Sequence, residues 1–135
     1  MRSNCNTTMA ARILLIDDNP DILEMLEVAL EYDHFTVKAI EDTQELIAIL
    51  ESFSPDPIIL DYVLKNDNGG EVCRMLKSHP QYKNMPIIIS TAYLIKPTAL
   101  FQYGCDAVIE KPFDLDELTS TVHEVLQDDV NHTDL

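Results

Sequence analysis

Residues 13–22 read ILLIDDNPDI, a run of four apolar residues that ends in two aspartates and is followed by Asn-Pro. A continuous apolar run of this length, bounded by polar residues, is typical of a strand buried on both faces of a parallel sheet. Asn19 and Pro20 favour the start of a helix, and apolar residues return at helical spacing from Ile22 onward. The stretch therefore predicts a buried strand that leads through a short acidic turn into an amphipathic helix.

The alternation of strand and helix recurs along the rest of the chain. Short apolar runs predict four further strands, at residues 35–39, 58–60, 86–90 and 107–109. A helix is predicted after each of these runs, starting near Asp42, Asn68, Pro97 and Asp114. Five strand–helix units in alternation require a parallel sheet with helices on both faces, which is an α/β doubly wound fold.

Two of these helices carry further signals at their ends. Asp42 and Glu45 have the spacing of a capping box, which predicts that the second helix opens at Asp42. The helix after Pro97 is weakly marked, and Gly104 predicts its end. We therefore expect the fourth helix to be short.

Composition and charge restrict the class of protein. The chain has 135 residues, of which 46% are hydrophobic and 24% charged, as in a single globular domain. A formal net charge of −15 repels phosphate backbones, so we expect no direct binding to nucleic acid. The apolar runs are far shorter than the roughly 20 residues of a membrane span, and the first ten residues lack the apolar region of a secretory signal. We therefore expect no membrane insertion and a cytoplasmic location.

The cysteines and the two ends of the chain predict the redox state of the protein and the bounds of the domain. Cys5, Cys73 and Cys105 form an odd set without CxxC spacing, which predicts free thiols in a reducing compartment and no zinc site. We expect residues 11–127 to form the domain, with flexible tails at residues 1–10 and 128–135.

Polar residues close the predicted strands at one edge of the sheet. Asp17 and Asp18 follow the first strand, Asp61 the third, Thr91 the fourth and Lys111 the fifth. Because the carboxyl ends of parallel strands share an edge, these side chains can converge where open α/β sheets bind ligands. Three carboxylates in one pocket favour a cation, and hard oxygen ligands suit Mg²⁺. Together with a hydroxyl and an ammonium group, this set predicts phosphoryl-transfer chemistry.

Four segments in this order resemble a known family. ILLIDDNPDI, PIILDYVL, MPIIISTAY and VIEKPF resemble the receiver domain of response regulators, the phospho-acceptor of two-component signalling, and the resemblance covers about residues 11–127. It implies a flavodoxin-like (βα)5 fold with a five-stranded parallel sheet in the order 2-1-3-4-5. It also implies a signalling phospho-acceptor rather than an enzyme that acts on an external substrate.

The resemblance assigns roles to the acidic residues. Asp61 is the expected nucleophile, which accepts a phosphoryl group to give an aspartyl phosphate. Asp18 and Asp61 are expected to ligate Mg²⁺ directly, while Asp17 acts mainly through water. The backbone carbonyl of Val63 is expected to complete the metal ligands of the protein.

The resemblance also assigns roles to the hydroxyl and the ammonium group. Thr91 is expected to hydrogen-bond a phosphoryl oxygen and to report phosphorylation by reorienting. Lys111 is expected to pair first with Asp61 and then with the phosphoryl oxygen. The Lys111–Pro112 peptide bond is expected to be cis, at the kind of bond where the cis form costs least.

Three features near the switch region depart from the family's pattern. Val108 stands three residues before Lys111, where an aromatic residue is usual, so an aromatic switch coupled to Thr91 cannot operate in its usual form. The interval from Thr91 to Lys111 is shorter than the family leads us to expect, which implies a trimmed fourth helix or preceding loop. The loop after Asp61 has Lys65-Asn66 where Pro-Gly is common, so its backbone is expected to be looser.

A fourth departure concerns the lifetime of the phosphoryl group. Val63 and Tyr93 stand two residues beyond Asp61 and Thr91, at the positions that tune dephosphorylation in the family. Neither side chain is a good base for an attacking water, so we hypothesise a comparatively long-lived phospho-aspartate.

The resemblance implies two kinds of protein partner. A sensor histidine kinase or a histidine phosphotransfer protein is expected to donate the phosphoryl group, and an unidentified downstream protein to receive the signal. Because the chain ends soon after the last predicted helix, we expect a stand-alone receiver, although a module cut from a longer protein remains an alternative.

Two alternative functions remain open. A pseudo-receiver that binds partners without phosphorylation is favoured by Val108 and the short fourth helix, and disfavoured by the complete set of strand-end residues. A phosphohydrolase resembling the haloacid dehalogenase group would need a second aspartate two residues after Asp17, where the chain has Asn19. Taken singly, Asp17-Asp18 could be a helix cap, and Asp61 a turn residue.

Overall fold

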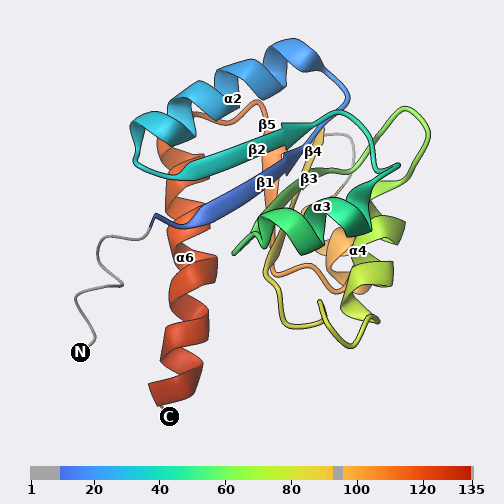
Figure 1. Cartoon of the computed structure of the whole chain (residues 1–135), viewed down its shortest axis with the longest axis vertical. Coiled ribbons are helices and arrows are strands. Elements are labelled where there is room, and N and C mark those ends of the chain that lie inside the picture. The colour runs from blue at the N-terminus through green and yellow to red at the C-terminus, as the bar shows by residue number, and fades with distance from the viewer. Residues whose placement is uncertain (1–9, 93–95, 135) are drawn as a thin grey trace.

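A five-stranded sheet forms the centre of the protein in the computed structural model, which describes residues 10–92 and 96–134, with side chains up to residue 127 (Figure 1). The strands are β1 (Arg12–Ile16), β2 (Thr36–Ile40), β3 (Ile58–Asp61), β4 (Ile87–Ala92) and β5 (Ala107–Lys111). Their order is β2-β1-β3-β4-β5, and every neighbouring pair is parallel. The predicted flavodoxin-like, doubly wound fold is confirmed.

Helices cover both faces of this sheet (Figure 1). They are α2 (Pro20–Tyr32), α3 (Leu46–Phe53), α4 (Gly69–Lys77), α5 (Pro97–Leu100), the 3-10 helix η1 (Phe101–Tyr103) and α6 (Leu115–Asp134). Buried residues of α2 and α6 belong to one core cluster, whereas those of α3, α4 and α5 belong to the other. The sheet thus separates two hydrophobic cores.

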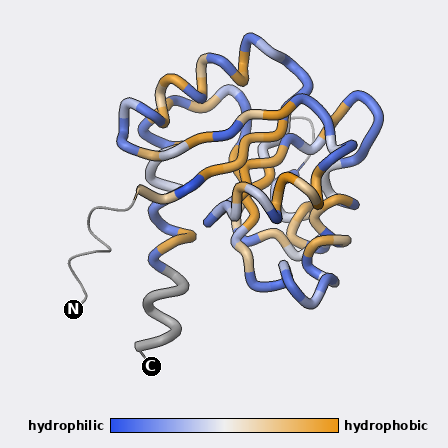
Figure 2. Tube along the Cα trace, in the orientation of Figure 1, coloured by the Kyte–Doolittle hydropathy of each residue, from blue (hydrophilic) through white to orange (hydrophobic). Residues whose placement is uncertain are grey.

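These two cores explain why β1 is apolar without interruption. Leu14 and Ile16 pack in the cluster with α3 and α4, whereas Ile13 and Leu15 pack in the cluster with α2 and α6. Successive side chains of a strand point to opposite faces, so a strand covered on both faces needs apolar residues at every position. Figure 2 shows the hydrophobic residues concentrated along the central strands.

The start of α3 differs from the prediction. The capping box expected at Asp42 is wrong, because the Asp42 carboxylate accepts a hydrogen bond from the backbone of Gln44 at 3.0 Å and so closes a local turn. The helix begins only at Leu46, and Glu45 makes no side-chain capping bond. Aspartate side chains that bond the backbone two residues on compete with helix formation, which delays the start of the helix.

The segment between β4 and β5 is as short as predicted. Helix α5 has 4 residues and is followed by the 3 residues of η1. Gly104 then adopts a φ of 93°, a left-handed conformation that glycine accepts at little cost. Tyr93, which was assigned a role by the resemblance, lies outside the described residues.

The two ends of the chain are only partly described. The predicted N-terminal tail, residues 1–10, lies outside the described residues except for Ala10. Helix α6 is capped as expected, since the backbone N–H of Glu117 donates to the Asp114 carboxylate at 2.7 Å. It continues to Asp134, past residue 127, where we expected the domain to end. Across residues 10–92 and 96–134, no helix has both the length and the apolar character that a membrane span requires.

Two of the cysteines are buried free thiols, as predicted. Burial raises the pKa of Cys73 to about 12 and that of Cys105 to about 11. Because the thiolate is the reactive form, both side chains serve as packing residues rather than nucleophiles. Cys5 lies outside the described residues.

Candidate acidic site at the sheet edge

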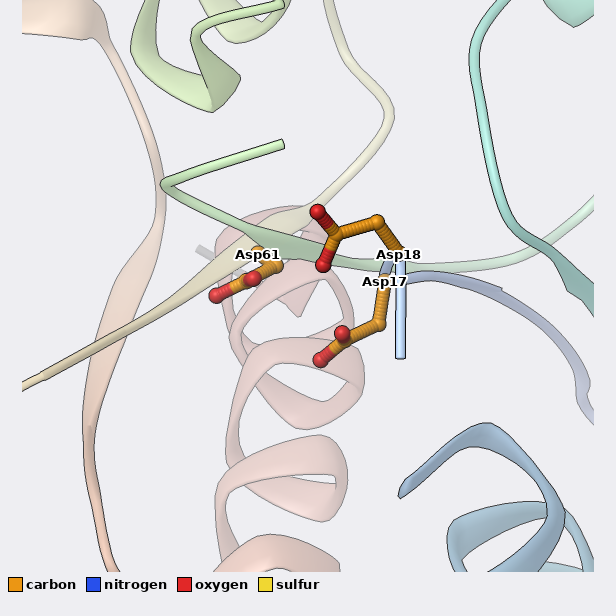
Figure 3. Close-up of side chains that lie close together, drawn as sticks. All are labelled: Asp17, Asp18 and Asp61. Atoms are coloured by element: carbon orange, nitrogen blue, oxygen red, sulfur yellow. The ribbon is translucent and has the colours of Figure 1, made fainter. Parts of the chain in front are cut away.

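Two neighbouring strands bring three carboxylates together at the carboxyl edge of the sheet. Asp17 and Asp18 follow β1 directly, and Asp61 is the last residue of β3. Ile16 of β1 lies beside Leu60 of β3, so the acidic residues that come next are neighbours in space. One carboxylate oxygen from each aspartate lies within 4.8 Å of the others (Figure 3). The predicted convergence of these side chains is therefore present.

The turn after β1 is organised by Asn19 rather than by the aspartates. The Asn19 side chain caps α2, accepting hydrogen bonds from the backbone of Asp21 at 3.0 Å and of Ile22 at 3.3 Å. The backbone N–H of Asn19 in turn donates to the Asp17 carboxylate at 3.0 Å. Neither Asp17 nor Asp18 is therefore the helix cap, and one carboxylate oxygen of each takes part in the cluster with Asp61.

Lys111 joins the acidic cluster from β5. Its ammonium group lies 3.1 Å from a carboxylate oxygen of Asp17 and 3.2 Å from one of Asp61. Both carboxylates are nearly buried, with 5% of Asp17 and 8% of Asp61 exposed. Lys111 is the last residue of its strand, and its peptide bond to Pro112 is cis, as expected. The predicted pairing of Lys111 with Asp61 is present, and Asp17 shares the same ammonium group.

The charges of this cluster are not balanced. Burial and the neighbouring Asp17 raise the pKa of Asp61, and the Lys111 ammonium only partly opposes them. Burial by itself would lower the pKa of Lys111, but Asp61 and Asp17 favour its charged form and raise the pKa overall. The partly desolvated pocket therefore holds three carboxylates and one ammonium group, which pairs with only two of them. A small divalent cation fits this donor set, because carboxylate oxygens are the ligands that Mg²⁺ prefers.

Thr91 lies on β4, the strand next to β3, one residue beyond the position that pairs with Asp61. β4 pairs with β3 so that Ser90 lies beside Asp61, and Thr91 follows. Thr91 is buried, and its hydroxyl donates to the backbone carbonyl of Ala92 at 3.3 Å. The hydroxyl thus has a backbone partner in its own strand.

Val63 occupies the loop between β3 and α4. An isolated bridge joins it to Asn68, and its side chain is 64% exposed. Gly69 follows this bridge and closes the loop against β3, since a Cβ there would stand 2.2 Å from the Asp61 carbonyl oxygen. The loop can approach the site this closely only because residue 69 is glycine.

Ser90 was not among the residues that the sequence indicated. Its hydroxyl donates to a carboxylate oxygen of Asp61 at 3.5 Å and is buried. The strand register identifies Ser90 as a site residue, because it is a polar residue in an apolar strand and pairs with the strand-end Asp61. Strand pairing, which the sequence alone did not fix residue by residue, is needed to recognise it.

Comparisons with known proteins agree with this geometry. The family model of the response regulator receiver domain matches residues 13–123. The DNA-binding response regulator MtrA of Mycolicibacterium smegmatis is 32% identical over 122 residues, which cover 89% of this chain and 52% of MtrA. The response regulator ArlR of Staphylococcus aureus is 34% identical over 118 residues, which cover 86% of this chain and 52% of ArlR. The chain thus spans about half the length of the curated relatives it matches.

A solved structure supports the same fold. The chemotaxis response regulator CheY4 of Vibrio cholerae superimposes with a TM-score of 0.79 at 26% identity. The match covers 87% of this chain and 100% of CheY4. The similarity therefore extends over a complete small receiver as well as over parts of longer regulators.

Proposed function

This chain belongs to the response regulator receiver domain family, and from that premise we propose that Asp61 is the residue that accepts a phosphoryl group. One observation carries the proposal. Asp61 lies in a cluster with Asp17 and Asp18 and is 3.2 Å from the Lys111 ammonium group, at the sheet edge where α/β folds bind ligands. An acidic pocket with one fixed cation has the groups needed to bind a metal ion and a phosphoryl group side by side.

The chemical step that we propose is the transfer of a phosphoryl group from a phosphohistidine. A carboxylate oxygen of Asp61 attacks phosphorus, and a P–O bond forms while the P–N bond to the imidazole breaks. The electron pair of the broken bond stays on the imidazole nitrogen, which takes up a proton. The product is an aspartyl phosphate, which water can hydrolyse to regenerate Asp61.

The fit of the acidic cluster to Mg²⁺ extends the proposal to the metal. Asp17, Asp18 and Asp61 would hold the ion, with the backbone carbonyl of Val63 as a further ligand. When bound, Mg²⁺ supplies positive charge to the phosphoryl oxygens, on which negative charge is spread in the transition state. The carboxylates give the pocket a negative charge that attracts a divalent cation, and Lys111 supplies a permanent positive charge beside them.

Lys111 and Thr91 are proposed to bind the product. The Lys111 ammonium is already held between Asp17 and Asp61, so it needs only a small movement to contact a phosphoryl oxygen on Asp61. The Thr91 hydroxyl would leave the Ala92 carbonyl and donate to another phosphoryl oxygen. This exchange of partners is what we propose reports the modification to β4.

The partners follow from the same proposal. A histidine kinase or a histidine phosphotransfer protein would supply the phosphoryl group, and a downstream protein would recognise the modified domain. MtrA is named as DNA-binding, but the match covers only about half of it. For the domain itself, the net charge of −15 still predicts no direct contact with nucleic acid.

Intact mass after incubation with acetyl phosphate tests the proposal. We expect a gain of one phosphoryl group that requires Mg²⁺ and is lost in Asp61→Asn. Asp67→Asn is the matched control, because Asp67 is an exposed carboxylate in the loop that follows Asp61. If the folded protein gains no phosphoryl group from acetyl phosphate or from a histidine kinase, the proposal fails, and an interaction module that needs no phosphorylation becomes the alternative.

A further inference from the structure

Tyr62, the residue after Asp61, contacts Tyr103 at the end of η1. Their hydroxyl oxygens lie 3.4 Å apart, and their ring centroids are separated by 6.1 Å. The two tyrosines stand 41 residues apart in the chain and pack against the same core cluster. The contact joins the strand end that carries Asp61 to the segment between β4 and β5.

The backbone of Tyr62 is held firmly on the Asp61 side of this contact. Its N–H donates to the Ser90 carbonyl at 2.8 Å, and its own carbonyl accepts from the Gly69 N–H at 2.7 Å. Gly69 also lies against Asp61, because a Cβ at that residue would stand 2.2 Å from the Asp61 carbonyl oxygen. A backbone adjustment at Asp61 is therefore passed to Tyr62 rather than absorbed by a loose loop.

The ring of Tyr103 is held equally closely on the other side. It lies over Gly70, where an added Cβ would be 2.5 Å from a ring carbon. The Arg74 guanidinium carbon lies 4.8 Å from the ring centroid, a distance at which a cation attracts an aromatic face. Tyr62, Gly70 and Arg74 thus surround the ring, so a movement of η1 that carries the ring with it changes all three contacts.

Val108 packs against this same core cluster. It stands at the position where the resemblance led us to expect an aromatic residue, and a valine side chain offers neither a ring to reorient nor a hydroxyl. Tyr103 supplies both on the same face of the sheet, five positions earlier in the chain. The aromatic group that touches the neighbour of Asp61 therefore comes from η1 instead of β5.

We propose that the Tyr62–Tyr103 contact transmits the phosphorylation state of Asp61 to η1. The inference rests on the proposed function, since it assumes that Asp61 is modified. A phosphoryl group adds negative charge to Asp61 and draws Lys111 toward itself, which changes the forces on the end of β3. Phe101 begins η1 and is 47% exposed, so a shift of this short helix changes the position of an exposed aromatic side chain.

Backbone amide chemical shifts of η1 test the inference. We would record them for Phe101, Gln102 and Gly104 before and after adding Mg²⁺ with beryllium fluoride, a mimic of the phosphoryl group. In the unaltered protein we expect clear shifts at these amides. In Tyr103→Leu we expect the shifts to fall by about twofold or more, in line with the coupling that single contacts carry.

Two further variants make the result specific. Gly70→Ala displaces the Tyr103 ring without changing either tyrosine, and alanine is well tolerated in a helix, so we expect the same loss of the η1 response. Tyr32→Leu is the matched control, because Tyr32 is 87% exposed on α2, and it should leave the response intact. If Tyr103→Leu fails to fold, Tyr103→Phe and Gly70→Ala decide the question.

The measurements separate failure of the inference from failure of the proposed function. Loading of Asp61 is followed independently by the ¹⁹F signal of bound fluoride and by intact mass after acetyl phosphate. The inference is overturned if the η1 amides of loaded protein do not shift. It is also overturned if they shift as much in Gly70→Ala and Tyr103→Phe as in the unaltered protein. Either result leaves the phospho-acceptor role intact. If Asp61 does not load at all, the proposed function fails and the inference fails with it.

Discussion

The edge that carries Asp61 and the segment from α5 to η1 are built by different means. Asp61 ends a strand with hydrogen-bonded neighbours on both sides, β1 and β4. The α5–η1 segment has only 4 and 3 residues in its two helical turns and attaches to the core chiefly through Leu100, with Tyr103 packed beside it. The sheet therefore positions the acidic site, whereas a few side chains attach the α5–η1 segment to the core.

The largest expected effect is on the free energy of unfolding, and it should differ between the central strand β3 and the α5–η1 segment. Leu60 in β3 and Leu100 in α5 are both fully buried in the same core cluster. We expect Leu60→Ala to lower the free energy of unfolding by about 4 kcal/mol and Leu100→Ala by about 2 kcal/mol, because a four-residue helix can collapse onto a smaller side chain and a paired strand cannot. Urea denaturation measures both values. A larger loss for Leu100→Ala would show that α5 is as firmly held as the sheet.

A smaller effect is expected from the charge at the sheet edge. Without Mg²⁺, burial and Asp17 raise the pKa of Asp61 above its ordinary value of 3.8. When the pKa of a carboxyl group is higher in the folded than in the unfolded protein, the free energy of unfolding falls as the pH rises from the unfolded-state pKa to the folded-state pKa. Asp61→Asn should therefore raise the free energy of unfolding at pH 7 and leave it unchanged well below the ordinary pKa of an aspartate.

Magnesium should reverse this difference. At about 100 times its dissociation constant, a ligand of the folded state adds about 2.7 kcal/mol to the stability of the unaltered protein, and Asp61→Asn should gain much less. Thermal or urea unfolding with and without Mg²⁺ measures the gain, and Asp67→Asn is again the control. An equal gain in Asp61→Asn would place the metal elsewhere.

The smallest effect on stability concerns the exposed loop of Val63. A phosphoryl group on Asp61 should be long-lived, because Val63 provides no base for water, and Val63→Glu should hasten its loss by about tenfold or more. Both Val63→Glu and the control Val63→Ala should change the free energy of unfolding by less than about 0.5 kcal/mol. Intact mass over time gives the rate. Slower loss in Val63→Ala would contradict the proposed lifetime.

The parts of this molecule that the sequence predicts are those built from local patterns. The strands follow from continuous apolar runs, and the cluster around Asp61 follows from the rule that parallel strands end at one edge. Asp42 was misread as a helix cap because a capping residue and a turn residue look alike in sequence. Ser90 depends on strand register, and the contact of Tyr62 with Tyr103 joins residues 41 positions apart, so neither is visible in a local pattern.

The strand order also determines when the charges of the site are compensated as the chain is synthesised. β1 lies between β2 and β3, so Asp17 and Asp61 can meet once the first three strands have emerged. Lys111 comes 50 positions after Asp61 (111 − 61) and arrives only with the last strand. The counter-charge of the two aspartates is therefore the last part of the site to be synthesised. Pairing of β5 with β4 is what brings Lys111 to Asp17 and Asp61, so completing the sheet also completes the site.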